Sequence, residues 1–531
     1  MVPDGDGIGD VGEARRRRNR GDYAEESQRS SRRRDEARWY QFIEFTPPDG
    51  SLEMKFYIEL AAVIVVLSLL AAWLGRGYAR RLIKRDGIRV DKFKLKSRHA
   101  DIEREVFGSE AVVSAVKNYA TEHRVSVDVA RRRAGMYLSE IVPKFNLLAY
   151  YRFGAPIART LLNFLYRVVV ERGPIEDFNR SAPKDAVVVY VINHRSNVDY
   201  LLVAHMLFKF ISLSYAVGEW ARVWPLNHLF KWFGGYFVRR RYREPLYHAV
   251  LSTFVQTITR HGVTQGIFIE GGLSRDGAFL KPKLGMLDYL VTAKRDPAFK
   301  APLFLVPTAV NYDRTLEDRN LTEELLGMED RSTRGEKLQT TFEFLFKNSL
   351  RSMMRRFKRY GYAIVSFGEP ILVDDVIRDH PTLLSAGFEE RKPALHLLAA
   401  AVMTSISNVL PPTPVSMAAT IFSRHAATEA VSDATLSAGM GSLRDEWAGR
   451  VWLLRETDGE GLWAAARELL LLRHLVQRVE GGWQWAPNQI LLRDYYANST
   501  RSFEEIAKRG WPQRVDGGEP IAEGVHTEAL S

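Results

Sequence analysis

The chain of 531 residues contains no cysteine. This absence excludes disulfide bonds, thiolate metal sites and a cysteine nucleophile. It fits a reducing compartment but does not establish one. No internal repeat is apparent, and a hydrophobic content of 46% is enough to bury a large core. The length predicts more than one structural unit, and shifts in composition indicate where the units change.

Residues 1–54 begin rich in glycine and aspartate and then carry two arginine clusters, at 15–18 and 32–34, interleaved with acids. This composition predicts a disordered tail. The acids partly offset the arginines, and no folded binding module surrounds them, so we expect no nucleic-acid partner. Met54 is an alternative start site, because an apolar segment follows it at once.

That segment, 55–75, predicts a transmembrane helix. Residues 56–74 are apolar except for Glu59 and Ser68, and at about 1.5 Å per residue they approach the roughly 30 Å of a bilayer core. The run has no evident cleavage site, so a membrane anchor fits better than a secretory signal. A buried core helix is the alternative, because the length is only just sufficient.

The region 76–170 begins with a basic segment. Between Arg76 and Arg98 there are ten basic residues against two acids, which favours contact with an anionic cytoplasmic leaflet. We therefore expect location at the cytoplasmic (inner) membrane, with the main domain facing the cytoplasm. An ordinary solvated surface run is the alternative. Apolar residues three and four apart in 112–120 and 137–150 then predict amphipathic helices.

The most informative stretch begins at Ala186. Residues 186–192 have the length and the Val/Ile content of a strand buried on both faces, and an apolar helical pattern resumes after Asp199. This order predicts an α/β fold with a mixed sheet that is covered by helices and flanked by further helical regions. His194 would follow the carboxyl end of the strand, which is where open α/β sheets place ligands.

His194 and Asp199 are the candidate catalytic residues. On one helix, residues five apart point about 140° away from each other, so the pair can meet only if His194 lies in the loop and Asp199 in the first helical turn. The carboxylate would then accept a hydrogen bond from one imidazole nitrogen and leave the other as a base. The pair alone is weak evidence, because Asp199 also fits as an ordinary acid at a helix N-terminus.

Three further segments follow in order: Gly234-Gly-Tyr-Phe-Val-Arg-Arg240, Phe268-Ile-Glu-Gly-Gly-Leu-Ser-Arg275 and Leu305-Val-Pro-Thr-Ala-Val-Asn-Tyr-Asp313. Together with His194-Arg-Ser-Asn-Val-Asp199 they resemble the four ordered blocks of the glycerolipid acyltransferase superfamily, and most of all those of the PlsB-type glycerol-3-phosphate acyltransferases. The resemblance implies transfer of a fatty acyl group from acyl-CoA or acyl-carrier protein to the sn-1 hydroxyl of glycerol 3-phosphate. The product would be lysophosphatidate for phospholipid synthesis.

The resemblance also implies roles for single residues. His194 would remove the proton from the hydroxyl while Asp199 supports the imidazole. Arg240 aligns with the substrate-binding arginine of the family, and Arg239 is a second candidate, although arginine runs are often partly solvated. No metal and no cofactor is expected beyond the acyl donor. Ser196 leaves open a route through an acyl-serine. The lack of a nucleophile-elbow context around Ser196 argues against that route.

The third and fourth blocks imply five further substrate-binding residues: Glu270, Gly271, Ser274, Arg275 and Pro307. The family typically has an arginine where this chain has Leu273, so we expect Arg275 to take over part of the phosphate contact. Glu270 is alternatively a residue that orients an arginine or caps a loop. Pro307 lacks an amide donor and is expected at a bulge or a strand end. Whether Tyr312 and Asp313 belong to the site stays open.

We place the acyltransferase domain at 171–375 and a mainly helical C-terminal domain at 376–531. The stretch 335–360 combines phenylalanines with arginines and fits either a membrane-surface helix or a helix packed on the sheet. Two alternatives to the function remain. One is an acyltransferase that acts on dihydroxyacetone phosphate or lysophosphatidate, and the other is a non-catalytic, membrane-tethered protein that binds lipid or an acyl carrier.

Overall fold

The computed structural model describes residues 99–143, 155–171, 173–207, 214–217, 235–239, 242–325, 359–447, 457–502 and 505. The predicted tail, the predicted membrane helix at 55–75 and the basic residues 76–98 lie outside these ranges, as do Arg240 and residues 335–358. Within the ranges described, no helix is both long enough and apolar enough to cross a membrane. The membrane helix therefore stays a prediction.

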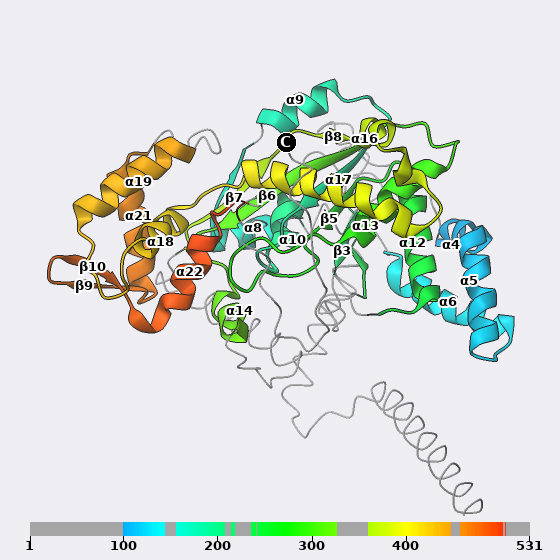
Figure 1. The fold of residues 1–531 in the computed structure, drawn as a ribbon, viewed down its shortest axis with the longest axis horizontal. Coiled ribbons are helices and arrows are strands. Elements are labelled where there is room, and N and C mark those ends of the chain that lie inside the picture. The colour runs from blue at the N-terminus through cyan, green and yellow to red at the C-terminus, as the bar shows by residue number, and fades with distance from the viewer. Residues whose placement is uncertain are drawn as a thin grey trace, which may run out of the picture. The chain divides into compact units, whose positions relative to one another are not determined.

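An eight-stranded sheet forms the centre of the fold (Figure 1). In chain order its strands are β1 (Arg167–Val170), β2 (Val187–Ile192), β3 (Ser214–Val217), β4 (Gly235–Phe237), β5 (Gln265–Phe268), β6 (Leu303–Tyr312), β7 (Tyr362–Phe367) and β8 (Ile371–Leu372). They lie in the order β1-β7-β6-β2-β5-β3-β4, with β8 also paired to β6. The pairs from β6 to β4 are parallel, whereas β7 and β8 run antiparallel to β6. The predicted mixed sheet is confirmed.

Strand β2 is buried on both faces, as predicted, because its side chains alternate between two cores. Val187, Val189 and Val191 belong to one core, and Val188, Tyr190 and Ile192 belong to the other. The first core includes α4 (His99–Gly108), α5 (Glu110–Glu122), α6 (Val127–Ile141), α12 (Pro245–Arg260), α13 (Leu284–Thr292), α16 (Val373–Asp379) and α17 (Phe388–Asn408). The second includes α8 (Ala155–Leu165), α9 (Gly173–Ser181) and α10 (Asp199–Leu207). Helices thus cover both faces of the sheet.

The helices before the sheet are partly as predicted. Helix α5 covers the predicted segment 112–120, and α4, α5 and α6 pack against α12, as Figure 1 shows. The prediction of a helix through 137–150 is wrong at its centre, because α6 ends at Ile141. Pro143 follows two residues later, and proline disfavours the helical conformation of the residue before it.

A third core lies in the C-terminal part of the chain. It is built around four tryptophans, Trp447, Trp463, Trp483 and Trp485. The elements that contribute to it are α18 (Pro414–Ser423), α19 (Asp433–Trp447), α21 (Gly459–Leu472), α22 (Ile490–Asn498) and the hairpin of β9 (Val476–Val479) and β10 (Gly482–Trp485). Helix α17 also follows residue 375 but packs against β6 in the first core. The domain boundary at 375 stays a prediction.

Pro307 lies inside β6, so the expectation of a strand end or bulge is wrong. On one side it pairs with Val191 of β2. On the other side the partner of β6 changes at this point, from β8 opposite Leu305 to β7 opposite Thr308. The Pro307 carbonyl accepts a hydrogen bond from Gly368 N, and N and O of one strand residue point to the same side. The missing N–H therefore faces the gap between β7 and β8, where no ladder bond is lost.

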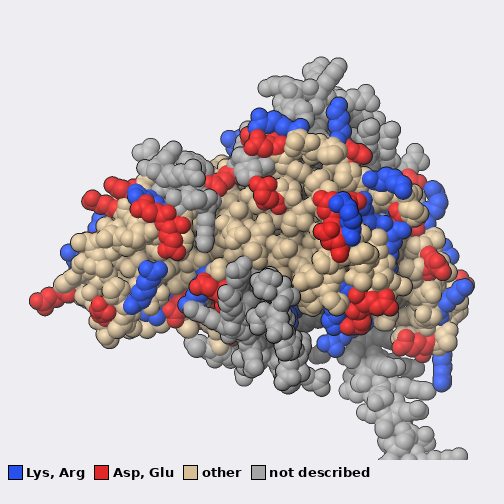
Figure 2. Space-filling view, turned by 45° about the horizontal axis from the view of Figure 1, so that its top comes forward, with Lys and Arg blue, Asp and Glu red and all other residues tan. Residues whose placement is uncertain are grey.

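Charged side chains of both signs are interspersed on the face shown in Figure 2. Basic and acidic groups of the described residues alternate there around broad uncharged areas. The net charge of +11 is thus not presented as one continuous basic surface on this face.

Candidate active site

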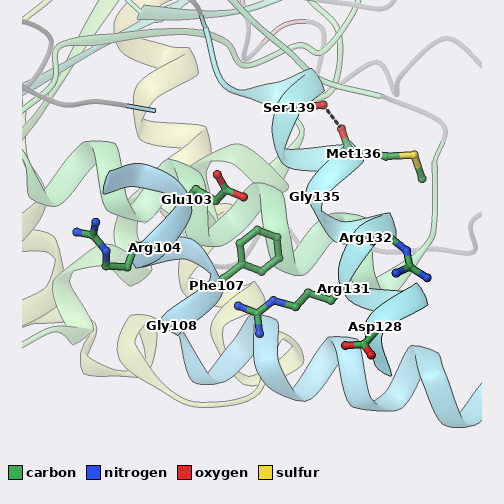
Figure 3. Close-up of a pocket in the computed structure, with 10 residues that line it drawn as sticks. All are labelled: Glu103, Arg104, Phe107, Gly108, Asp128, Arg131, Arg132, Gly135, Met136 and Ser139. Atoms are coloured by element: carbon green, nitrogen blue, oxygen red, sulfur yellow. Dashed lines mark hydrogen bonds between the residues drawn. The ribbon is translucent and has the colours of Figure 1, made fainter. Parts of the chain in front are cut away.

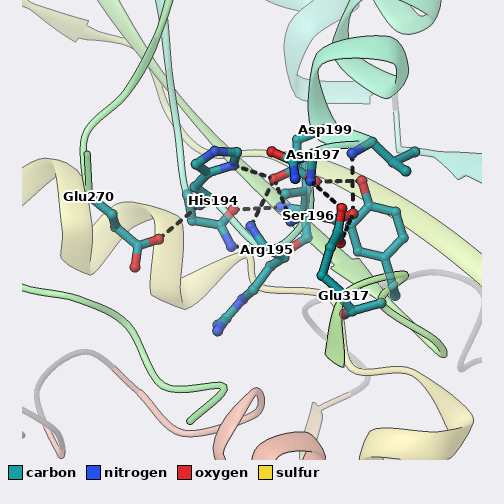
Figure 4. Close-up of polar contacts among 12 residues, drawn as sticks. His194, Arg195, Ser196, Asn197, Asp199, Glu270 and Glu317 are labelled. Atoms are coloured by element: carbon teal, nitrogen blue, oxygen red, sulfur yellow. Dashed lines mark hydrogen bonds and ion pairs between the residues drawn. The ribbon is translucent and has the colours of Figure 1, made fainter. Parts of the chain in front are cut away.

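The candidate site lies where β2 ends and α10 begins. Ile192 is the last residue of the strand and Asp199 the first residue of the helix, so the loop between them carries His194. His194 Nδ1 lies 2.9 Å from Asp199 Oδ2, and both side chains are buried (Figure 4). The expected geometry is confirmed: the pair meets because one residue is in the loop and the other is in the first helical turn.

Four donors hold Asp199. Its Oδ2 accepts hydrogen bonds from His194 Nδ1, from Arg195 N at 2.8 Å and from Ser196 N at 3.1 Å. Its Oδ1 accepts from the Tyr312 hydroxyl at 2.5 Å. The carboxylate is therefore fixed on both oxygens and in turn fixes the orientation of the imidazole.

Aromatic side chains enclose the imidazole. The ring centroids of His194 and Phe268 are 4.3 Å apart, and Tyr200 approaches edge-on at 5.5 Å. His194 is only 1% exposed. A substrate hydroxyl therefore reaches Nε2, the nitrogen that Asp199 does not engage, only when neighbouring groups move. The apolar surroundings also strengthen the electrostatic interaction with Asp199.

Carboxylates bind four consecutive backbone N–H groups of the loop. The N–H of His194 donates to Glu270, those of Arg195 and Ser196 donate to Asp199, and that of Asn197 donates to Glu317. A buried loop has no ladder partners, so its amides need acceptors from side chains. Three carboxylates from three parts of the chain thus hold the loop backbone in place.

Two of these carboxylates have strongly shifted pKa values. Burial raises the pKa of Glu270 to about 7, although the Arg195 cation and the N–H groups of Leu280 and His194 oppose the shift. Burial also raises the pKa of Glu317 to about 7, against the hydrogen bond from Ser196. Both groups therefore change charge near neutral pH.

Ser196 does not have the geometry of a nucleophile. Its hydroxyl donates to Glu317 Oε2 at 2.8 Å and accepts from Val198 N at 3.2 Å. An acyl-serine route needs the serine hydroxyl to donate to its base. The hydroxyl proton is directed to Glu317, not to His194, so the geometry argues against that route through this histidine.

Arg239 is engaged in an ion pair. Its Nη2 lies 2.7 Å from Glu140 Oε1, its Nε lies 3.1 Å from Glu140 Oε2, and the guanidinium stacks over Tyr242. Arg239 follows β4, which is three strands away from β2, or about 14 Å at the usual strand spacing. Among the described residues, Arg239 is thus set apart from His194, and its role in binding substrate stays a prediction. Arg240 lies outside those residues.

The other predicted binding residues follow β5. Arg275 Nε lies 2.7 Å from Glu324 Oε2, and the Ser274 hydroxyl donates to Asp276 at 3.0 Å. Gly271 has a φ of +65°, and a Cβ there would lie 2.9 Å from the Lys283 side chain, so glycine is strongly favoured. The structure therefore brings Glu270 to His194, whereas Arg275 and Ser274 bind other side chains. Pro307, buried in β6, neighbours Val191 in β2.

A large cavity lies elsewhere, in the helical region before the sheet. Its volume is about 1100 Å³, and it lies between α4 and α6, where Phe107 and Arg131 face each other (Figure 3). It contains none of the predicted site residues. In the part of the chain that the structure describes, no three His, Asp or Glu side chains form a group that could hold a metal ion.

Two family models match the chain. Residues 175–311 match the model described as Acyltransferase, and residues 346–503 match the Glycerol-3-phosphate acyltransferase C-terminal region. Similar proteins include a glycerol-3-phosphate acyltransferase of Aeromonas hydrophila, 29% identical over 62% of this chain and 40% of its own length. Another, from Haemophilus influenzae, is 29% identical over 56% of this chain and 36% of its own length.

By sequence, this chain is similar to glycerol-3-phosphate acyltransferases. It spans less than half the length of the curated relatives that it matches. A solved 1-acyl-sn-glycerophosphate (LPA) acyltransferase, PlsC, from Thermotoga maritima matches at a TM-score of 0.27 with 19% identity, over 48% of this chain and 76% of that one. A likeness this loose adds nothing to the sequence matches.

Sequence reasoning missed part of the candidate site. Glu317 was not considered, and Tyr312 was left undecided. Asn193, whose amide exchanges two hydrogen bonds with the backbone of Val310 at 2.7 and 3.0 Å, was also overlooked. Their position in the chain could have pointed to Tyr312 and Glu317. Tyr312 ends β6 and Glu317 follows it, at the same edge of the sheet as His194.

Proposed function

We propose that this chain transfers a fatty acyl group from acyl-CoA or acyl-carrier protein to the sn-1 hydroxyl of glycerol 3-phosphate, forming lysophosphatidate. The observation that carries the proposal is the buried His194–Asp199 pair at the carboxyl end of β2. It lies within the region that matches the acyltransferase model, and the glycerol-3-phosphate acyltransferase C-terminal region follows it in the chain.

The geometry supports general base catalysis. With Nδ1 bound to Asp199, His194 Nε2 takes the proton of the substrate hydroxyl. The hydroxyl oxygen then forms the new ester bond to the thioester carbonyl carbon. The carbon–sulfur bond breaks, and the leaving thiolate recovers the proton from the imidazolium. Asp199 stabilises the imidazolium formed in between, and positioning of both substrates supplies much of the remaining rate enhancement.

The substrate phosphate requires cationic partners. Arg240 and Arg275 are the arginines that the family resemblance assigns to it, because a guanidinium can bind phosphate through two parallel hydrogen bonds. Arg275 would exchange its present partner, Glu324, for the phosphate. Both side chains of that ion pair are about one-third exposed, so the exchange involves little desolvation.

The membrane location is part of the same proposal. The apolar segment 55–75 would anchor the chain, and the basic residues 76–98 would face the anionic cytoplasmic leaflet. This would hold the acyltransferase domain on the cytoplasmic side of the inner membrane. Carbonate extraction of membranes tests the anchor: the full chain should stay in the membrane pellet, and a variant lacking 55–75 should be released.

The activity is tested with detergent-purified full-length protein and a long-chain acyl-CoA. Glycerol 3-phosphate, dihydroxyacetone phosphate and lysophosphatidate are offered in parallel, and His194→Ala is the matched variant. We expect lysophosphatidate from glycerol 3-phosphate, and a loss of at least about 10³-fold in the variant because the base is absent.

The outcomes are distinct. Preference for another acceptor would keep the chemistry and replace glycerol 3-phosphate in the proposal. Full activity in His194→Ala would reject the assignment of the base. Absence of turnover with every acceptor, with acyl-CoA and with acyl-carrier protein as donors, would reject the enzyme and favour a binding protein.

A further inference from the structure

We propose that Arg195, the residue next to the candidate base, binds the phosphate of a substrate through the edge of its guanidinium formed by Nε and Nη2. Arg195 is not among the residues assigned to the phosphate above. The inference rests on the proposed function for the identity of the substrate, but the binding site itself can be tested without turnover.

The first observation is a buried cation with unused donors. Arg195 is 1% exposed. Among the described residues, its Nε and Nη2 meet no hydrogen-bond acceptor. Of the three guanidinium nitrogens, Nη1 has an acceptor in the described part of the chain, the carbonyl oxygen of Gly277. Buried polar groups are nearly always hydrogen-bonded, and an uncompensated buried charge is costly, so two unused N–H groups on one buried cation need an explanation.

The second observation is which two donors are unused. The Nε–H and Nη2–H bonds lie on the same edge of the guanidinium plane and run parallel to each other. This edge, which we call the fork, matches two oxygens of a phosphate or a carboxylate in a bidentate contact. The carbonyl of Gly277 holds the opposite side of the group, and the ring of Phe279 lies 5.1 Å from the guanidinium carbon. The fork is therefore held in one orientation before any ligand binds.

The third observation concerns the surroundings of the fork. Gly277 and Phe279, which contact the guanidinium, belong to the segment after β5 that also carries Leu273. Leu273 packs against the C-terminal core. The Arg195 charge also acts on Glu270, whose pKa it lowers against the larger effect of burial. Arg195 thus supplies a buried cation to the segment that follows β5.

Two candidate ligands carry a phosphate that fits the fork, glycerol 3-phosphate and coenzyme A. Their phosphate oxygens have the same chemistry. Arg195 directly follows His194, and glycerol 3-phosphate has to place its hydroxyl at that histidine. We therefore assign the fork to the acceptor, and coenzyme A is the alternative that the experiment separates.

The decisive variant is Arg195→Met, which keeps an unbranched aliphatic stem but removes the charge and the fork. Arg319→Gln is the control, because it removes one exposed arginine from helix α14 (Asp318–Leu325), which follows β6 at the same edge of the sheet. Binding of glycerol 3-phosphate, inorganic phosphate and coenzyme A to the full chain is measured by calorimetry without an acyl donor. We expect Arg195→Met to weaken binding of glycerol 3-phosphate and phosphate on the order of 10- to 100-fold and to leave coenzyme A unchanged.

Steady-state kinetics supply a second readout. The KM for glycerol 3-phosphate should rise by a similar factor in Arg195→Met, with the KM for acyl-CoA unchanged. Arg195→Lys should lie between the variant and the wild type, because a lysine keeps the charge but not the fork. Thermal unfolding then separates binding from a structural role. Removing a buried cation that has two unused donors should leave the melting temperature unchanged or raise it, whereas loss of a structural arginine would lower it.

Unchanged binding of all three ligands by Arg195→Met, or a wild type that binds none of them, would overturn the inference. A loss confined to coenzyme A would support the phosphate site and assign it to the donor. If Arg195→Met does not fold, Arg195→Lys decides by the same measurements. Binding that depends on Arg195 in a protein without turnover would reject the proposed function and keep the site, so the two failures can be told apart.

Discussion

Replacement of Asp199 by asparagine tests whether its charge supports the base. An asparagine can keep its oxygen toward the three N–H donors of His194, Arg195 and Ser196 and turn its amide toward Tyr312. The Tyr312 hydroxyl can then accept a hydrogen bond where it now donates one. The substitution therefore removes the charge and preserves the hydrogen bonds.

The magnitude follows from the separation of the charges. An imidazolium and a carboxylate with charge centres about 4 Å apart interact by about 4 kcal/mol at an effective dielectric constant near 20. The interaction is gained only when the imidazole is protonated, so its loss raises the barrier by the same amount. We expect kcat of Asp199→Asn to fall by about 10³-fold.

The assay is acyl transfer to glycerol 3-phosphate at saturating substrates, with urea unfolding of the same samples. Tyr312→Phe is the control, because it removes one donor from Asp199 and leaves the charge; its kcat should fall by less than about tenfold. Asp199→Ala is unsuitable, since it leaves three N–H donors without their acceptor at a cost of about 1–3 kcal/mol each. A fall of less than tenfold in a folded Asp199→Asn would refute the electrostatic role.

Two further predictions concern stability. Burial raises the pKa of Glu317 in the folded protein to about 7 from 4.5. The contribution of Glu317 to the free energy of unfolding is therefore most favourable below pH 4.5 and is lost as the pH rises through 7. Glu317→Gln removes this loss. The unfolding free energy of the variant should therefore gain up to about 3 kcal/mol on that of the wild type between pH 4.5 and 8, and urea titrations with parallel pH profiles would disprove it. At Gly277, φ is +82° and an added Cβ would lie 1.8 Å from the backbone oxygen of Tyr495 in α22. Gly277→Ala should cost about 2–4 kcal/mol in urea unfolding, whereas Gly285→Ala, where a Cβ meets open space, should cost little; equal midpoints for the two variants would show that α22 does not pack as described.

Much of the sheet could be read from the sequence because its signal is local. A run of Val and Ile from residue 186 to 192 ends in polar residues, which is enough to predict a strand buried on both faces and a loop at its end. The same reasoning placed Asp199 in the first turn of a helix, since the spacing to His194 allowed no other way for the pair to meet. Both expectations are confirmed.

The conformation of Pro307 could not be read in this way. A proline is compatible with the interior of β6 only because the neighbouring strand changes from β8 to β7 at that residue. The partners of a strand come from distant parts of the chain, so the cost of the missing N–H is unknown until they are placed.

The sequence by itself determined which chemistry to propose, through a candidate base and a carboxylate at a fixed spacing and through the order of four motifs. Only the tertiary structure decided which other residues meet there. Glu270 and Glu317, 76 and 120 or more residues away in the chain, bind the loop backbone, and Gly277 orients Arg195. These contacts depend on which strands lie side by side. The pairing of distant strands produces no periodic pattern in the sequence, so it could not be predicted from the sequence.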